Sequence, residues 1–463
     1  MKFSWFLGGI LSMGLGLTQT PEAFVYGKGN VGSGDLRACF FSRGVPSLGS
    51  NLELVCANLQ KSSPGVMLLS TGKASIGLGN FTLLVNATMS FPLSWVSAKE
   101  NRAEFCEARF SVPVSAGMLG SKVFVQTFFF DSGAPGGWVA SQGIGLGFGN
   151  APAEYTCVYD LNAYKKYFAG VTSQTQADAL GRKIWNAHKV QGFSYVKTEY
   201  FDLVKDPKKG KGFWIVIVKH AKIGLEFSLI PAGDFVQGCD NVRLYEKWVK
   251  PLRRVRIWKP LLVSRFEVTQ GLWKKIMGSE PWKGKRYAKS NDKYAASYIS
   301  WLKAKEFCKK AGLRLPTESE WEWAARAGCL DPNEWFYFGR NKMLAFEFDK
   351  FGWFAHNCQG ANKYAHEVGK WKPNPFGLYD VLGNIGEFCA DTPLYRKGGY
   401  NVPWTYKKYP TDGSAFLERA KDKLPLRGGS WRTCSVHASF QCRELGDTSG
   451  VFDTGLRPVC DLR

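Results

Sequence analysis

Twelve cysteines and five histidines are the side chains of this 463-residue chain best suited to bind a soft metal ion or to act as nucleophiles. No two cysteines form a C-x-x-C pair, and no histidine stands at ligand spacing from a cysteine, so a zinc site is not expected. Cys434 and Cys442 are eight positions apart, with His437 between them. No Ser-His-Asp, HExxH or P-loop pattern offers another mechanism. The question that the sequence raises is therefore what its cysteines do.

The first 23 residues predict an export signal. Lys2 precedes an apolar run over residues 3–17, and small or polar residues follow as far as Ala23. The run is shorter than the roughly 20 residues that span a bilayer and contains several glycines, so a cleavable signal is favoured over a retained anchor. No transmembrane segment is expected after its removal. We expect a secreted or cell-envelope protein, periplasmic or extracellular, in which disulfides are favoured over metal thiolates.

The net charge of +22 is concentrated in the later part of the chain. Residues 1–157 contain ten Lys and Arg against eight Asp and Glu, or +2, which leaves +20 for residues 158–463. Residues 283–294 and 395–410 interleave basic and aromatic side chains, a composition that can stack on bases and neutralise phosphates. Because an exported protein seldom meets nucleic acid, we expect no nucleic-acid partner. The basic face is interpreted as solvated, or as a contact for an anionic glycan or envelope component.

Short strands dominate the pattern of residues 24–160. Apolar runs of four to nine residues, separated by turn residues, occupy 66–70, 81–89, 108–114 and 122–130. They predict a β-sandwich or a β-barrel. Residues 124–148 resemble a β-sandwich module of secreted bacterial proteins, so we expect an all-β sandwich that serves as an accessory or spacer domain. Glycines at 143, 145, 147 and 149 do not fit G-x-G-x-x-G and precede no helical pattern, so we interpret them as close strand packing or a flexible hairpin.

The following segment, residues 161–223, is predicted to be a linker that contains a short helix over 175–190 and a strand over 213–220. His188 and His220 are interpreted as core or surface residues and not as ligands. From residue 224 onward, helix signals are clear. Thr269 is an N-cap residue type, residues 297–312 have one apolar face and end at a glycine, and Thr317 with Glu320 forms a capping box.

Six motifs stand in a fixed order between residues 267 and 459: EVTQ, SWLKAKEFC, RLPTESEWEWAARAG, NPFGLYDVLGNIGEF, RGGSW and GLRPV. In this order they resemble the formylglycine-generating enzyme family, also called sulfatase-modifying factor. The resemblance covers residues 224–463, about half of the chain. It implies a C-terminal α+β domain of the C-type-lectin-like kind, and hence a multidomain protein with the β-sandwich in front.

The resemblance also implies a calcium site and a disulfide. The calcium ligands would be the side chains of Asp380 and Glu387 and the backbone carbonyls of Gly383 and Ile385, oxygen donors that suit a hard cation. The alternative is that Asp380 and Glu387 are buried carboxylates satisfied by backbone amides. The disulfide would join Cys308 on the second helix to Cys460 on the final strand.

Members of the family oxidise a substrate cysteine to formylglycine with two cysteines, five positions apart, that bind copper(I). Counted from Trp431, those positions hold Thr433 and Ala438, which cannot bind copper as thiolates. Cys434 and Cys442 are out of register. We expect both in structural disulfides, and a displaced catalytic pair is the alternative. The possible disulfide partners are each other, Cys329, Cys358 and Cys389.

By the same resemblance, Arg427, Ser430 and Trp431 would line the substrate cleft, although Arg427 can equally be strand framework. The leading hypothesis is an exported protein whose family domain has no copper oxidase site, is not an enzyme, and binds an unidentified ligand or serves as a structural module at the cell envelope. The alternative is a divergent, copper-dependent formylglycine-generating oxidase.

Overall fold

The structure is a computed structural model, and its N-terminal part is built from strands alone over the residues it describes. Residues 1–19 of the predicted signal and most of the basic stretch 395–410 lie outside the described residues, as does His437. The described residues are 20–26, 39–59, 65–70, 73–78, 81–85, 89–93, 106–114, 118–119, 121–130, 134, 138–202, 212–238, 252–332, 334–338, 345–393, 409–417, 423–434 and 438–462.

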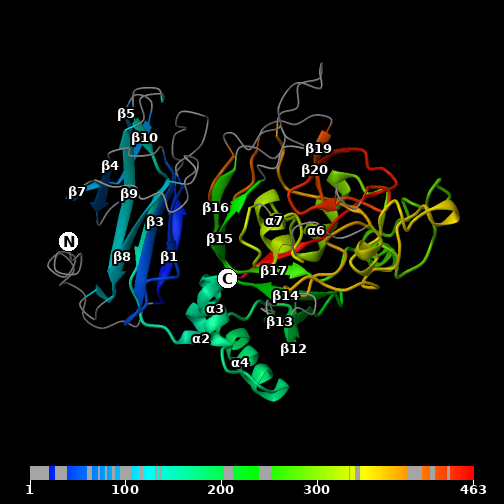
Figure 1. The fold of residues 1–463 in the computed structure, drawn as a ribbon, viewed down its shortest axis with the longest axis horizontal. Helices are drawn as coiled ribbons and strands as arrows, with labels where there is room; N and C mark the ends of the chain where they lie inside the picture. Colours follow the sequence, from blue (N-terminus) through cyan, green and yellow to red (C-terminus); the bar gives the residue numbers. More distant parts are fainter. Residues whose placement is uncertain are drawn as a thin grey trace.

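The N-terminal strands form a six-stranded sheet, a three-stranded sheet and a hairpin (Figure 1). In the large sheet the order is β1 (Glu22–Tyr26), β11 (Gly143–Gly147), β9 (Lys122–Phe130), β4 (Gly65–Ser70) and β7 (Met89–Leu93), with β10 (Trp138–Ala140) beside β9. The smaller sheet is β2 (Cys39–Arg43), β3 (Asn51–Leu59) and β8 (Cys106–Pro113), and the hairpin is β5 (Lys73–Leu78) with β6 (Phe81–Val85). Side chains from both sheets, including Phe41, Leu54, Val125 and Ile144, share one core.

Strand β1 includes the last two residues of the predicted signal peptide. Glu22 pairs with Gly147 and Ala23 with Leu146, and Lys122 forms an ion pair with Glu22 at 2.5 Å. The boundary at residue 23 therefore falls inside a paired strand. In the part of the chain that the structure describes, no helix has the length and apolarity to cross a membrane.

The glycines of β11 provide a flat surface for aromatic rings from β1. A Cβ added at Gly143 would lie 2.4 Å from Cζ of Tyr26, and one at Gly145 would lie 2.4 Å from Cζ of Phe24. Both rings also contact Phe124 edge to face. The interpretation of these glycines as close strand packing is confirmed, because any side chain at 143 or 145 would displace a ring.

A Gly145→Ala substitution is expected to cost about 1–3 kcal/mol of unfolding free energy, because the added methyl overlaps Phe24. Chemical denaturation measures the change. In the Phe24→Ala background the same substitution should cost much less, since the overlapping ring is gone. Equal costs in the two backgrounds would contradict the packing described here.

The predicted linker is part of the second half's largest sheet. It contains α3 (Leu161–Tyr167), α4 (Gln174–Ala187), β12 (Phe193–Phe201) and β13 (Phe213–His220), preceded by α2 (Ala153–Thr156) and η5 (Cys157–Tyr159). The predicted helix and strand are present, but α3 and β12 were not predicted. Figure 1 shows the three α-helices at the junction of the two halves. Because β12 and β13 join the sheet β12-β13-β14-β17-β22, the segment belongs to the C-terminal half.

The C-terminal half mixes short sheets, helices and long loops. Strands β14 (Glu226–Ile230), β17 (Leu261–Ser264) and β22 (Val459–Asp461) complete the five-stranded sheet, and β15 (Gly233–Gln237) pairs with β16 (Arg253–Ile257). A third sheet has the order β20 (Arg443–Asp447), β19 (Lys423–Arg427), β18 (Gly386–Phe388), β21 (Thr454–Gly455). The helices are α5 (Gln270–Met277), α6 (Trp301–Ala311) and α7 (Glu318–Arg326), with short 3-10 turns η6 (Ala345–Lys350) and η7 (Gly360–Asn362).

The caps that the sequence predicted are present. Thr269 Oγ1 accepts from the backbone N–H of Leu272, and Thr317 and Glu320 form both bonds of the capping box. α6 ends at Gly312, which has a φ of 70°. Local sequence therefore determines where the helices of this half begin.

A buried carboxylate joins the two halves. Arg43 of β2 donates to both oxygens of Asp234 at 2.9 Å, and Arg254 donates to Oδ2 at 2.9 Å. Arg256 approaches Oδ1 to 3.9 Å. Burial opposes ionisation of Asp234, but Arg43, Arg254 and Arg256 outweigh it and lower its pKa to about 2. Trp258 also packs into the N-terminal core, so the first half is fixed onto the second.

Asp234→Asn is expected to destabilise the protein by about 3–5 kcal/mol, because Arg43, Arg254 and the fully buried Arg256 would lose the carboxylate that they share. Chemical denaturation measures the change, and Glu53→Gln, which removes the more exposed partner of Arg43, should cost less than about 1 kcal/mol. A depressed pKa contributes stability above the unfolded value near 3.9. Wild-type stability should therefore fall as the pH drops from about 4 to 2, and the variant should lack this step. If Asp234→Asn lowers the unfolding free energy by less than about 0.5 kcal/mol, the loss is that of an exposed ion pair, and the assignment of Asp234 as a buried partner of these arginines is contradicted.

Candidate functional site

Two buried carboxylates of helix α7 form ion pairs with the strands next to the candidate site. Glu322 Oε2 accepts from Arg427 of β19 at 2.5 Å, and Glu322 Oε1 accepts from Arg326 at 2.9 Å. Glu318 accepts from Arg443 of β20 at 2.6 and 2.7 Å. The side chains of all these pairs are fully buried. The helix therefore fixes the third sheet by ion pairs as well as by apolar packing.

Arg427 also positions the segment that follows Ala438. Its guanidinium donates to the carbonyls of Phe440, Gln441 and Cys442, each at 3.1 Å. These carbonyls and Glu322 belong to the framework, and the side chain of Arg427 is completely buried. The contacts favour the framework interpretation of Arg427, and its assignment to a cleft stays a prediction.

Thr433 and Ala438 lie side by side on one face of Gly429. A Cβ added at Gly429 would lie 3.0 Å from the Cβ of Ala438 and 3.3 Å from Cγ2 of Thr433. Gly429 itself has a φ of 70°, in the left-handed region that favours glycine. The backbone therefore brings together the two positions that the family resemblance assigns to copper ligands. Their side chains, a methyl and a secondary alcohol, are not donors for a soft monovalent ion.

Hydroxyl groups and carboxylates surround these positions. Ser430 Oγ donates to Asp453 at 2.9 Å, and Thr433 Oγ1 donates to Glu444 at 3.2 Å. Burial raises the pKa of Glu444, and the charge of Asp453 adds to the effect. Arg432 reaches Asp453 at 3.3 Å. The described residues around Thr433 thus form a hydrogen-bonded cluster of hard oxygen groups.

The two remaining cleft residues are buried as well. Ser430 is 1% and Trp431 3% exposed. The ring of Trp431 contacts Tyr287 and Phe452 at centroid distances of 5.9 and 5.7 Å. Both side chains are thus buried in this structure, Trp431 against aromatic rings and Ser430 in hydrogen bonds, and their assignment to a substrate cleft stays a prediction.

The predicted disulfides are not formed in the structure. Cys434 is an exposed thiol, and Cys329, Cys358 and Cys389 are also free. Cys308 is free and buried, and burial raises the pKa of its thiol to about 12. Cys308 and Cys460 both pack on the main core of the C-terminal half, so their pairing stays a prediction. Of the alternative catalytic pair, Cys434 is exposed and Cys442 is buried, and their joint role stays a prediction.

The predicted calcium ligands fit a cation only in part. Asp380 is buried, its Oδ2 accepts from the N–H of Gly369 at 2.6 Å, and its Oδ1 has no hydrogen-bond partner. Burial raises the pKa of this carboxyl to about 6. Glu387, by contrast, is neutralised by Arg457 at 2.7 Å and accepts from the indole of Trp321 at 2.6 Å. Among the described residues, no three His, Cys, Asp or Glu side chains converge in a way that could hold a metal ion.

Addition of Ca²⁺ tests the role of Asp380. If calcium binds there, the temperature of thermal unfolding should shift upward. At a calcium concentration 100 times the Kd, binding adds about 2.7 kcal/mol to the unfolding free energy. The shift should be smaller at pH 5 than at pH 7.5, because a carboxyl with a pKa of about 6 is then protonated. Asp380→Asn should abolish it. The control Asp391→Asn removes another buried carboxylate, one whose oxygens accept from backbone N–H groups, and should keep it. A wild-type protein indifferent to Ca²⁺ would exclude the site.

Sequence reasoning missed the carboxylates that matter most here. Glu318 and Glu322 stand four apart on α7, yet the helix signature drew attention to Thr317 and Glu320. Glu267 was also missed, although its carboxylate accepts from Asn384 at 2.5 Å and from the N–H of Ile385 at 3.1 Å. Burial raises the pKa of Glu267 well above its usual range. For Glu318 and Glu322, the available signal was their i, i+4 spacing on α7.

The basic stretch 283–294 is exposed at its lysines and arginine, in keeping with a solvated face. Arg286 lies 4.5 Å from the ring centroid of Tyr287, and Lys289 lies 4.3 Å from that of Tyr364. These cations therefore already stack on aromatic rings of the same chain.

Comparison with known proteins identifies the C-terminal half. Residues 218–461 match the model of the sulfatase-modifying factor enzyme 1-like domain. The chain belongs to this family, as the six ordered motifs predicted.

Several characterised relatives share part of this sequence. The formylglycine-generating enzyme of Thermomonospora curvata is 39% identical over 102 residues, 20% of this chain and 32% of the enzyme. That of Mus musculus is 26% identical over 260 residues, 44% of this chain and 65% of the enzyme. The inactive C-alpha-formylglycine-generating enzyme 2 of Mus musculus is 33% identical over 110 residues, 23% of this chain and 34% of that protein. The chain thus spans less than two thirds of the length of these relatives.

Among solved structures, PvdO from Pseudomonas aeruginosa is similar over 53% of this chain and 98% of its own, with 26% identity and a TM-score of 0.45.

Proposed function

We propose that the C-terminal domain is a non-catalytic binding or structural module of an exported protein at the cell envelope. The observation that carries the proposal is the pair Thr433 and Ala438, which the backbone holds beside Gly429 where the family resemblance expects two copper-binding cysteines. Similarity to a protein named as an inactive relative supports it. In this proposal the N-terminal half is a β-sandwich accessory domain, and the second half has the C-type-lectin-like fold.

Copper(I) binding tests the proposal directly. Wild-type protein should retain no stoichiometric copper(I) in a competition assay with a chromogenic chelator. Thr433→Cys/Ala438→Cys should gain one tightly held ion, because two thiolates at this spacing suit a soft monovalent cation. Thr433→Ser/Ala438→Ser is the matched control, which adds oxygen and not sulfur at the same places and should remain copper-free.

The competing function is a divergent formylglycine-generating oxidase that uses Cys434, and its specific support is that this thiol is exposed. Full-length protein incubated with copper(I), oxygen and a peptide carrying Cys-x-Pro-x-Arg would then produce the formylglycine mass change, and Cys434→Ser would abolish it. We expect no product. Turnover that depends on Cys434, or tight copper(I) retention by the wild-type protein, would overturn the proposed function.

A further inference from the structure

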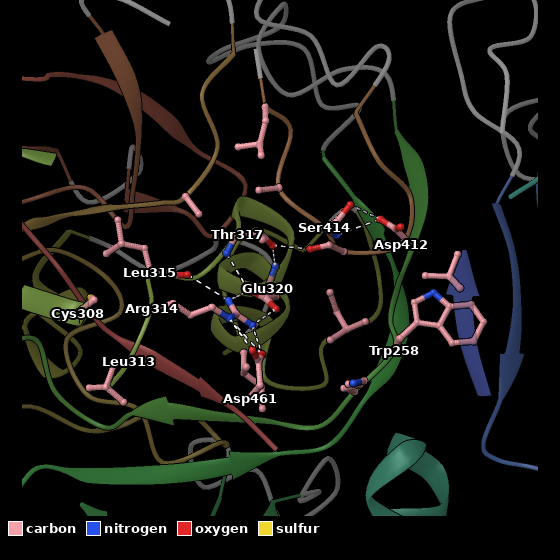
Figure 2. Close-up of a pocket in the computed structure, with 18 of the residues that line it drawn as sticks. Trp258, Cys308, Leu313, Arg314, Leu315, Thr317, Glu320, Asp412, Ser414 and Asp461 are labelled. Atoms are coloured by element: carbon pink, nitrogen blue, oxygen red, sulfur yellow. Dashed lines mark hydrogen bonds and ion pairs between the residues drawn. The ribbon is translucent and has the colours of Figure 1, made fainter. Parts of the chain in front are cut away.

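A cavity of about 800 Å³ lies where the two halves of the protein meet, away from the Thr433 and Ala438 positions (Figure 2). Strand β1 contributes one wall, and the β16–β17 connection with Trp258 contributes the next. Helix α6, the segment 313–320 and residues 412–417 complete the lining. Figure 2 shows Trp258 on the side toward the N-terminal strands and Cys308 on the opposite side. A volume of this size suits a small organic molecule, for which pockets of roughly 300–1,000 Å³ are usual.

Apolar side chains form most of this lining. Phe24 and Val25 come from the N-terminal half, and Leu313 and Leu315 come from the C-terminal half. Leu417 at the edge is 71% exposed, unusual for a leucine that has a nearby apolar surface to cover. A ligand that fills the cavity would remove this apolar surface from water, which favours binding.

The acidic groups of the cavity are already neutralised or hydrogen-bonded. Arg314 donates to both oxygens of Glu320 at 2.7 Å, and it also contacts Asp461, as Figure 2 shows. Asp412 accepts from the backbone N–H of Ser414 at 3.0 Å and from its hydroxyl at 2.6 Å. The carboxylates are thus held within the protein and do not call for a cation.

The lysines of α6 differ between its two faces. Lys303 and Lys310 form ion pairs with Glu306 at 2.8 and 3.1 Å, away from the cavity. Lys305 and Lys309 line the cavity instead. The ammonium of Lys305 lies 4.2 Å from the ring centroid of Trp301, and Lys309 forms no ion pair with any residue in the described part of the chain. Two cations without carboxylate partners therefore face the same space.

Trp258 forms the wall of the cavity on the side toward the N-terminal strands (Figure 2). Its side chain is only 8% exposed and packs into the N-terminal core. Its ring therefore offers an apolar contact, on the side of the cavity opposite Cys308 of α6.

We propose that this cavity binds an organic anion with an apolar body. The anionic group lies beside Lys305 and Lys309 of α6, and the apolar body lies against Phe24, Trp258 and Leu313. Because one wall is strand β1, the bound molecule contacts both halves of the protein. The inference does not depend on whether positions 433 and 438 lack copper, since no residue of that cluster lines the cavity.

Isothermal titration of the full-length protein with octanoate, 1-octanol and octyltrimethylammonium tests the charge and the apolar requirement together. Octanoate should bind most tightly, 1-octanol more weakly, and octyltrimethylammonium should show no saturable binding. Lys305→Gln/Lys309→Gln should weaken octanoate about tenfold or more, the effect of losing roughly 1.4 kcal/mol from two partly exposed charge contacts.

Lys303→Gln/Lys310→Gln is the matched control, because it removes the same charge from the other face of the same helix and should leave octanoate binding within about twofold. Circular dichroism confirms that each variant is folded. The proposal fails if octanoate does not bind the wild-type protein, if the cationic probe binds equally well, or if the two lysine pairs have the same effect.

Discussion

The C-terminal domain depends on two carboxylates of one helix that are buried with arginines. The arginines come from two neighbouring strands that lie much later in the sequence. Glu318 and Glu322 of α7 lie opposite Arg443 and Arg427, and all four side chains are inaccessible to water. Transfer of such a pair out of water costs free energy. Removal of one partner leaves an unpaired buried charge, which destabilises a protein by about 3–5 kcal/mol. For Glu318, burial opposes ionisation, yet Arg443 and Arg427 outweigh it and lower its pKa. The interaction therefore specifies one arrangement of helix and sheet, since a shifted strand would bury unpaired charges.

The same ion pairs also support the segment around positions 433 and 438. Arg427 donates to the carbonyls of residues 440–442 while Glu322 neutralises it, so the guanidinium fixes the path of the chain after Ala438. Thr433 is held from the other side by Ser430 and Glu444. The support around positions 433 and 438 thus comes from ion pairs and hydrogen bonds of the chain itself.

The sequence predicted what local rules determine. Helix starts at Thr269 and Thr317, the strand over 213–220, the packing role of the β11 glycines and the family of the second half all follow from spacing and residue type. What could not be predicted is pairing over distance. Glu322 and Arg427 are 105 residues apart and Glu318 and Arg443 are 125 apart, and charge type alone does not name a partner. For the same reason the sequence could not show that Arg427 is buried against Glu322.

The contacts between the two halves bear on the role of the N-terminal half. A spacer would touch its neighbour through a few exposed contacts, whereas here Asp234 of the family domain is buried against Arg43 of β2, and Trp258 of the family domain lies in the N-terminal core. Strands β15 and β16 are thereby covered by the accessory strands and are not left as an exposed hairpin. Since burying apolar surface and a charge together requires a fixed geometry, the N-terminal half acts as a structural part of the family domain. Any ligand that enters the seam between them must therefore be recognised by both.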